Sequence, residues 1–238
     1  MNTIIFDLDG TLLPMNQDLF LKKYFDGLSK KGKAHGIEEE VFIKSVWAGT
    51  KSMLENDGEK TNEERFWETF TSIHGKDAKT WEKIFENYYK NEFNDVKVVT
   101  SPTPYAKKSV NMLKEKGYDL ILATNPLFPQ IATFNRMRWA GINPEDFKFV
   151  TTYENSRYSK PNLKYYKEIL EKAQKEPQEC LMIGNDIIED MCVSKIGIKT
   201  FLLRDCIIGE EDYELKDYEA GDFKDLLKFI EELPVIIK

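Results

Sequence analysis

The sequence predicts an α/β fold in which a parallel sheet is packed between helices and a helical segment is inserted after the first strand. Short apolar runs alternate with helix-like patterns, as in parallel sheets whose strands are joined by crossover helices. The stretch from about residue 15 to residue 94 interrupts this alternation, because it reads as several amphipathic helices without a convincing strand. The first apolar run ends in two aspartates and a glycine, and polar residues follow later runs as well.

Five short apolar runs are the predicted strands. They cover residues 3–8, 119–123, 147–151, 180–183 and 199–203. The segment after Thr103 shows the helix pattern clearly, since Thr103 can cap a helix, Pro104 suits its first turn and Gly117 ends it. Further helices are predicted at residues 129–140, 162–173 and 187–196.

The inserted stretch contains four apolar faces at helical spacing. They are Leu21, Tyr24, Phe25 and Leu28; Phe42, Val46 and Trp47; Phe66, Trp67, Phe70 and Ile73; and Trp81, Ile84, Phe85 and Tyr88. Because aromatic rings bury large areas, such stripes form a core more often than a binding site, and we expect a core here.

Composition excludes several classes of function. The 238 residues carry a formal net charge of −7 without a long basic block, so nucleic acid and anionic membranes are poor partners. No membrane span or signal peptide is recognisable, which predicts a cytoplasmic protein. Cys180, Cys192 and Cys206 lack CxxC spacing and are expected to be buried, reduced thiols. His35 and His74 lie far apart, so catalysis must depend on carboxylates, hydroxyls and lysine.

Asp7 and Asp9 directly follow the first predicted strand. Two residues apart on an extended chain, they can face the same side and share one site. The alternative is a turn, in which an aspartate only accepts hydrogen bonds from the backbone.

Polar residues also follow the other predicted strands, where ligands of open α/β sheets bind. The run LILATN ends in Thr124 and Asn125, LMIGND ends in Asn185 and Asp186, and Lys160 stands just before a predicted helix. Each has an ordinary explanation: Thr124 and Asp186 as cap or turn residues, and Lys160 as a surface charge. Their joint occurrence in this order favours a shared site.

With these stretches the chain resembles the haloacid dehalogenase-like hydrolase superfamily, the largely magnesium-dependent phosphatases and related phosphotransferases. The matching motifs are DLDGT at residues 7–11, Thr124 with Asn125, Lys160 with Pro161, and GNDIIED at residues 184–190. The resemblance implies a Rossmann-like core of residues 1–14 and 98–238, with a helical cap of residues 15–97 inserted between the first two motifs.

A carboxylate that attacks a phosphoryl group forms an aspartyl-phosphate, which divides one difficult displacement into two easier steps. By its match to the family motif, Asp7 would be this nucleophile. Asp9 would protonate the leaving oxygen and later take a proton from the hydrolytic water.

The phosphoryl group would be bound by Thr11, Thr124, Asn125 and Lys160, of which Thr124 and Lys160 meet the charge on its oxygens. Backbone N–H groups of residues 8 to 11 and of Asn125 are expected to assist.

Magnesium prefers oxygen ligands and keeps several waters, which suits a few carboxylates and a substrate phosphate. The resemblance implies that Mg²⁺ is held by Asp7, the backbone carbonyl of Asp9, and Asp186. Asp190, one helical turn after Asp186, would face the same site and bind a metal-bound water or orient Lys160.

The last motif departs from the pattern of many relatives, which have the acidic residue directly after the glycine. Here Asn185 stands between Gly184 and Asp186. Glu189 also competes with Asp190 for the role of the second acid.

The expected activity is the hydrolysis of a small phosphorylated metabolite. Asp9 argues against carbon–halogen chemistry, because the dehalogenases typically lack the second aspartate. A phosphosugar mutase or other phosphotransferase is the alternative within the superfamily, and a receiver-like or inactive binding module is the alternative outside it. Anion contacts could come from arginines, each of which is more often a solvated or core-edge charge: Arg65, Arg136, Arg138 and Arg157. The sequence does not indicate an oligomeric state.

Overall fold

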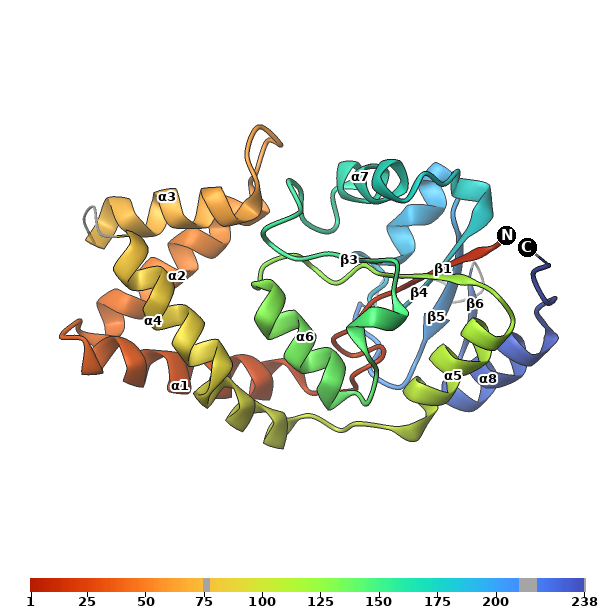
Figure 1. Ribbon diagram of the computed structural model, residues 1–238, viewed down its shortest axis with the longest axis horizontal. Helices are drawn as coiled ribbons and strands as arrows, with labels where there is room; N and C mark the ends of the chain where they lie inside the picture. The colour runs from red at the N-terminus through yellow and green to blue at the C-terminus, as the bar shows by residue number, and fades with distance from the viewer. Residues whose placement is uncertain (75–77, 210–217, 238) are drawn as a thin grey trace.

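A computed structural model describes residues 1–74, 78–209 and 218–237. Its centre is a six-stranded parallel sheet in the order β3-β2-β1-β4-β5-β6, with β1 in the middle (Figure 1). The strands are β1 Thr3–Phe6, β2 Asp119–Leu122, β3 Phe149–Val150, β4 Cys180–Gly184, β5 Lys199–Leu203 and β6 Glu219–Gly221. This arrangement confirms the predicted α/β class.

Each of the five predicted runs overlaps a strand, whereas β6 was not predicted. Its sequence, Glu-Ala-Gly, has no apolar run, and its position is fixed by pairing with β5 instead. The pairing between Phe201 and Glu219 at the start of this ladder is information that a single sequence does not display.

The helices are α1 Gln17–Ala34, α2 Glu39–Leu54, α3 Asn62–His74, α4 Ala78–Lys90, α5 Pro104–Glu115, α6 Gln130–Trp139, α7 Leu163–Ala173 and α8 Phe223–Glu232. Shorter 3₁₀ helices are η1 Glu92–Val99, η2 Pro144–Asp146, η3 Pro177–Glu179 and η4 Met191–Ile196. No helix within the described ranges is long and apolar enough to cross a membrane.

The capping signal predicted for α5 is confirmed, and α7 has a similar cap that was not predicted. The hydroxyl of Thr103 accepts a hydrogen bond from the N–H of Tyr105 at 3.4 Å, and Pro104 opens α5. Asn162 caps α7 in the same way by accepting from the N–H of Lys164 at 3.0 Å.

The prediction of a helix at residues 187–196 is wrong for the first half of this segment. Only the second half is helical, as the 3₁₀ helix η4. The reason is the side chain of Asp186, whose Oδ1 accepts hydrogen bonds from the N–H groups of Ile188 and Glu189, each at 2.8 Å. These bonds bend residues 186–189 into a turn before the chain can become helical.

Helices cover both faces of the sheet. Side chains of β1 alternate: Ile4 packs in one buried cluster with Val110 of α5 and Leu226 of α8, whereas Ile5 packs in a second cluster with Ile169 of α7. A strand in the middle of such a sheet is buried on both faces, which explains its continuous apolar sequence.

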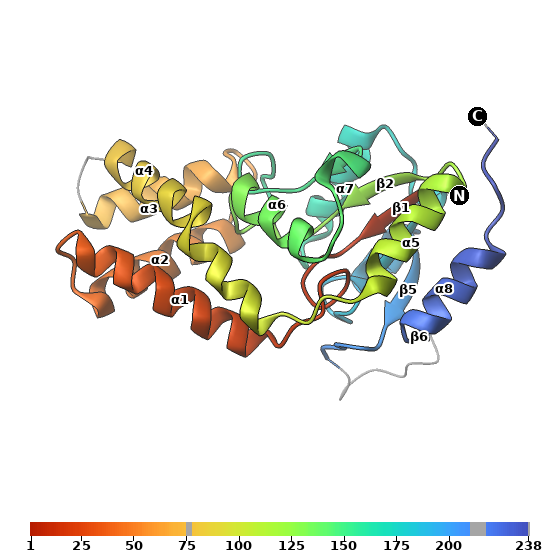
Figure 2. The same ribbon diagram turned by 60° about the horizontal axis from the view of Figure 1, so that its bottom comes forward.

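Helices α1 to α4 form a separate group at one end of the molecule, beyond the edge of the sheet (Figure 2). The chain enters and leaves this group through neighbouring segments, because the N–H of Ser101 donates to the carbonyl of Pro14 at 2.8 Å and Met15 pairs with Thr100. The insert therefore begins and ends at the same edge of the core.

The aromatic stripes of the insert form its core, as expected, but with two exceptions. Phe42 is fully buried and packs against the rings of Phe70, Trp81 and Phe85. Trp47 and Ile73 are 47% and 48% exposed, so the expectation of burial is wrong for these two side chains.

We expect Phe42→Ala to lower the free energy of unfolding by about 3–5 kcal/mol, because it empties the centre of the insert. The matched control is Val41→Ala on the same helix, whose side chain is 43% exposed and whose effect should stay within about 0.5 kcal/mol. Urea unfolding measures both values. Equal losses from the two variants would contradict the assignment of Phe42 to a packed core.

Candidate active site

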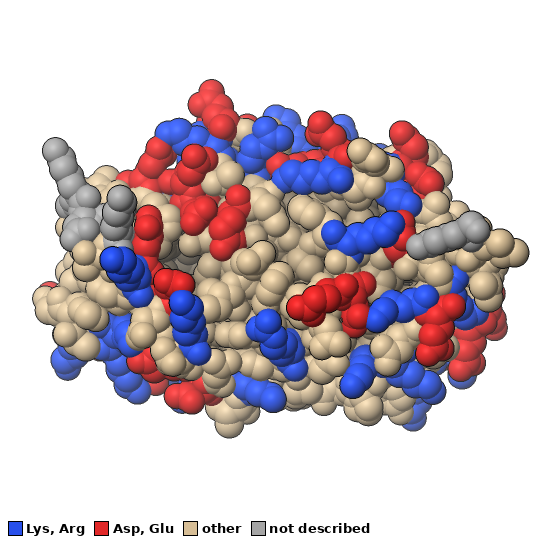
Figure 3. All heavy atoms as spheres, viewed as in Figure 1, with Lys and Arg blue, Asp and Glu red and all other residues tan. Residues whose placement is uncertain are grey.

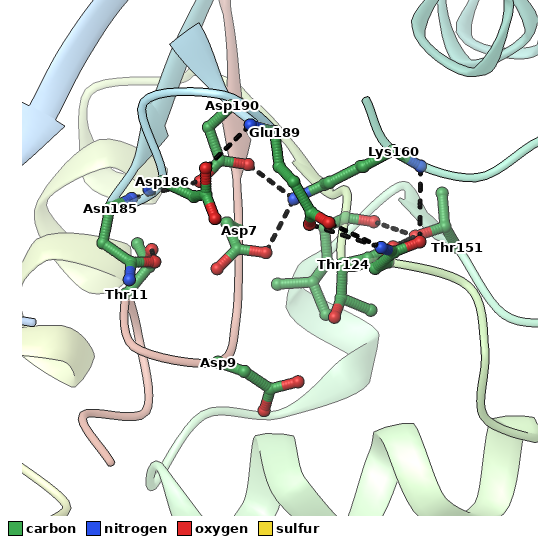
Figure 4. Close-up of polar contacts among 12 residues, drawn as sticks. Asp7, Asp9, Thr11, Thr124, Thr151, Lys160, Asn185, Asp186, Glu189 and Asp190 are labelled. Carbon is green, nitrogen blue, oxygen red and sulfur yellow. Dashed lines mark hydrogen bonds and ion pairs between the residues drawn. The ribbon is translucent and has the colours of Figure 1, made fainter. Parts of the chain in front are cut away.

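Residues from distant parts of the chain meet where the central strands end. The segment after β1 carries Asp7 and Asp9, Thr124 follows β2, and Asp186 and Asp190 follow β4 (Figure 4). This is the carboxyl edge of the parallel sheet, at which open α/β folds bind ligands.

Lys160 is at the centre of the group. Its ammonium donates to Oδ1 of Asp7 at 2.7 Å and to Oδ1 of Asp190 at 2.6 Å, and its side chain is 1% exposed. Burial by itself lowers the pKa of Lys160, but the carboxylates of Asp190 and Asp7 raise that pKa well above its ordinary value. The lysine is therefore held as a cation and not as a solvated surface charge.

Asp190, rather than Glu189, is the second acid that binds Lys160. Its other oxygen, Oδ2, accepts the N–H groups of Asn185 and Asp186, both at 3.1 Å. Burial raises the pKa of Asp190, although the charge of Lys160 opposes this change. A Cβ at position 184 would lie 2.2 Å from Oδ2, so Gly184 is needed for the carboxylate to reach these amides.

Asn125 connects the second motif with the third and the fourth. Its side-chain amide donates to Glu189 at 3.1 Å, and its Oδ1 accepts the backbone N–H of Lys160 at 3.3 Å. The neighbouring Thr124 is buried, and its carbonyl accepts hydrogen bonds from the hydroxyls of Thr151 at 2.8 Å and Tyr165 at 2.7 Å. These contacts fix the backbone that presents the Thr124 side chain.

Asn185, the additional residue of the last motif, binds the first motif. Its Oδ1 accepts from the Thr11 hydroxyl at 2.8 Å, and its amide donates to the carbonyl of Cys206 at 2.6 Å. Gly10 has φ +89°, and a Cβ there would come within 2.4 Å of the Asn185 side chain. The glycine of DLDGT thus serves both the left-handed turn and this close contact.

Thr11 and part of its loop do not face the phosphate-binding position that the sequence analysis expects. The Thr11 side chain is fully buried against Asn185, and its N–H donates to the carbonyl of Leu8 at 3.2 Å. The N–H of Gly10 donates to the carbonyl of Leu13 at 2.9 Å. The expectation that all backbone N–H groups of residues 8 to 11 face a phosphate is corrected for Gly10 and Thr11, because the loop uses them internally.

Asp9 pairs with Arg136, one of the four arginines that the sequence offers as possible anion contacts. Arg136 of α6 is fully buried and forms an ion pair with Oδ2 of Asp9, whose side chain is 22% exposed. Burial raises the pKa of Asp9, the Arg136 charge opposes this and the Asp7 charge adds to it. The guanidinium also lies over the ring of Phe128, 4.5 Å from its centroid.

The other three arginines bind elsewhere. Arg65 pairs with Asp57, Arg157 with Glu168, and Arg138 donates to Asn135. The signal for Arg136 in the sequence is weak, because only the packing of α6 beside the first motif distinguishes it from an exposed helix charge such as Arg138.

A cavity of about 780 Å³ opens between the sheet edge and the inserted helices. Asp7, Asp9, Thr124, Asn125 and Asp186 line its inner end together with Glu189 and Asp190. Lys160 and Thr11 lie behind this wall and reach the cavity only through the residues they bind. Most of the predicted site residues are therefore gathered around one space.

Among the described residues, no three side chains of His, Cys, Asp or Glu come together as a ready metal cluster. Asp7 and Asp186 nevertheless line the same end of the cavity, and one oxygen of Asp186 is occupied by the turn at residues 186–189. Two carboxylates with room for waters and a phosphate are the kind of donor set that magnesium accepts, so the residues fit this ion.

A model of the haloacid dehalogenase-like hydrolase family matches residues 1–191. The chain therefore belongs to the haloacid dehalogenase-like hydrolases, as its motifs predicted. Phosphoglycolate phosphatase from Aquifex aeolicus is 25% identical over 206 residues, which are 85% of this chain and 84% of that relative. Pyrophosphatase PpaX from Anoxybacillus flavithermus is 26% identical over 235 residues, 97% of each chain. The crystal structure of a HAD phosphatase from Thermococcus onnurineus has the same fold, with a TM-score of 0.60 and 19% identity over 99% of this chain and 100% of that one.

We expect Arg136→Met to destabilise the protein by roughly 3 kcal/mol, because it leaves the carboxylate of Asp9 without its cation. Arg138→Met on the same helix is the matched control and should change stability by no more than about 0.5 kcal/mol. Adding Asp9→Asn to Arg136→Met should recover part of the loss, since no charge is then left unpaired. Chemical denaturation of the four proteins provides the test, and a loss that Asp9→Asn does not reduce would refute the charge argument.

Proposed function

We propose that this hydrolase is a magnesium-dependent phosphatase that cleaves a small phosphomonoester through an aspartyl-phosphate. The observation that carries the proposal is Asp7, a carboxylate at the inner end of a large cavity and in contact with a buried lysine whose pKa the neighbouring carboxylates raise. Membership of the haloacid dehalogenase-like hydrolases supports the reaction class, as do relatives that are themselves phosphatases.

In the proposed first step, Asp7 attacks phosphorus, the bond to the leaving oxygen breaks, and the leaving group departs as an alcohol. Lys160 holds Asp7 in place through the 2.7 Å contact and brings positive charge next to the reacting group. Thr124 lines the same end of the cavity, where its hydroxyl can donate to a phosphoryl oxygen. Asn125 supplies its backbone N–H, and Thr11 acts indirectly by holding Asn185.

Asp9 is the proposed acid that protonates the leaving oxygen and the base that then deprotonates the attacking water. Burial raises its pKa, which suits a carboxyl group that must carry a proton before the first step. The ion pair with Arg136 fixes the direction of the side chain, which points away from Asp7 in Figure 4.

For the metal we propose Asp7, the backbone carbonyl of Asp9, and Asp186 as ligands. Mg²⁺ in this position supplies positive charge that relieves the repulsion between carboxylates and the phosphate. Asp190 already accepts three hydrogen bonds from Lys160, Asn185 and Asp186, so we assign it to holding Lys160 and to contact with a metal-bound water.

We further propose that residues 1–14 and 98–238 act as the catalytic core and residues 15–97 as its cap. The proposed partner is a small phosphorylated metabolite, and neither nucleic acid nor a membrane is proposed as a partner. A cytoplasmic location stays a prediction, with which three free cysteines agree. Of these thiols Cys180 is buried as expected, whereas Cys192 and Cys206 are partly exposed.

Purified protein with Mg²⁺ should release inorganic phosphate from members of a broad phosphomonoester panel, and EDTA should abolish the release until Mg²⁺ is restored. Phosphate and the remaining alcohol are measured together. Formation of an isomeric sugar phosphate without free phosphate would favour the mutase alternative. A stable phosphoprotein that never turns over would favour a receiver-like module, and unimpaired release in EDTA would exclude the metal.

Asp7→Asn and Asp9→Asn should fail differently. The first removes the nucleophile, so no phosphoenzyme should form and activity should be lost almost completely. The second removes proton transfer, which typically costs about 10²–10⁴-fold in rate. Its effect should be smaller for an activated aryl phosphate than for an alkyl phosphate, because a phenolate departs without a proton. If Asp9→Asn slows both substrates equally while Asp7→Asn remains substantially active, the two roles are wrongly assigned.

A further inference from the structure

The cavity continues from Asp7 into the inserted helices, where its walls change character. Rings from all four inserted helices and from the loop before α6 line this outer part, among them Tyr24, Trp47, Trp67, Phe85 and Phe128. The stripes that the sequence assigned to a core thus also form the wall of a pocket. A volume of about 780 Å³ is in the upper part of the range for sites that bury a drug-sized molecule, and far exceeds what one phosphoryl group fills.

Trp47 is the exposed member of this wall. It is 47% exposed and stacks on Phe25, with ring centroids 5.0 Å apart and an interplanar angle of 26°. Both side chains line the cavity, and a large indole left in water is a surface on which a ligand ring can stack. Val46 and Leu54 continue the apolar surface on the same helix.

The charges of the outer wall are mostly negative. Four glutamates line it, Glu63, Glu82, Glu86 and Glu154, whereas Lys83 is the one lysine or arginine among the described residues that line the cavity. Burial and the charges of Glu154 and Glu82 raise the pKa of Glu63. The contribution of the two glutamates indicates a negative electrostatic potential around the Glu63 carboxylate. Acidic side chains gather beside a hollow at the left of the face shown in Figure 3.

We propose, on the basis of the phosphatase function above, that the substrate is the phosphate ester of an aromatic or arylalkyl alcohol whose leaving group carries no anionic charge. The rings of Trp47 and Phe25 stack on the leaving group, and the glutamates reject a second carboxylate or phosphate. Phosphoglycolate and pyrophosphate, named for the two relatives, each carry such a second anionic group, and this wall offers them one lysine against four glutamates.

The direct test compares kcat/KM for 2-phenylethyl phosphate, glycerol phosphate, phosphoglycolate and pyrophosphate. We expect 2-phenylethyl phosphate to be preferred over phosphoglycolate at least tenfold. Trp47→Ala should lower kcat/KM for 2-phenylethyl phosphate by about 2- to 12-fold, the range of aromatic pair energies, and should lower kcat/KM for glycerol phosphate by a smaller factor. Ile73→Ala is the control, because Ile73 is equally exposed but does not line the cavity.

The charge argument has its own variant. Glu63→Gln should raise kcat/KM for phosphoglycolate relative to 2-phenylethyl phosphate, whereas Glu68→Gln, an exposed position on the same helix outside the cavity, should leave the ratio unchanged. An unchanged ratio in Glu63→Gln would overturn this part of the proposal.

Binding to the wild-type protein separates the substrate class from the reaction class. Calorimetry with 2-phenylethylphosphonate and with phosphonoacetate, both in Mg²⁺, compares an apolar with an anionic tail independently of turnover. Tighter binding of phosphonoacetate, or a preference for phosphoglycolate in turnover, would overturn the substrate class while leaving the phosphatase intact. Preferential binding of the arylalkyl compound without any phosphate release would instead support the pocket and contradict the proposed function.

Discussion

The contact on which the site depends is the buried ammonium of Lys160 between Asp7 and Asp190. Removing three charged groups from water is costly, and only close, well-oriented contacts compensate for that cost. Lys160 achieves this with contacts of 2.7 Å and 2.6 Å, and Asp190 uses its remaining oxygen for two backbone amides. One side chain therefore fixes the ends of β1 and β4 relative to the segment before α7.

The neighbouring contacts extend this constraint to the rest of the site. Asn185 holds the loop after β1 through Thr11, and Gly10 and Gly184 leave the space that these contacts need. Asn125 ties the end of β2 to Glu189 and to the backbone of Lys160. These hydrogen bonds between loops hold the site residues in fixed positions. A reaction that depends on positioning and charge requires such a fixed arrangement.

The inserted helices meet two requirements at once. They pack into a stable core of their own, and they also line part of the cavity. Phe42 and Phe70 are fully buried and hold the helices together, whereas Trp47, on the same helix as Phe42, faces the open space. The two roles lie on one apolar stripe. The two side chains differ in their exposure to solvent. That exposure depends on how α2 packs against its neighbours and on what lies across the cavity.

The sequence by itself determined five of the six strands, the cap of α5, and the gathering of Asp7, Asp9, Thr124 and Lys160 at one edge. These follow from short-range signals: apolar runs, capping residues, and the rule that carboxyl ends of parallel strands share an edge. Tertiary structure alone decided that β6 pairs, that Arg136 reaches Asp9, that Thr11 turns toward Asn185, and that part of an aromatic stripe becomes a wall. Each of these depends on contacts between residues far apart in the chain, and such contacts are set by packing rather than by local pattern.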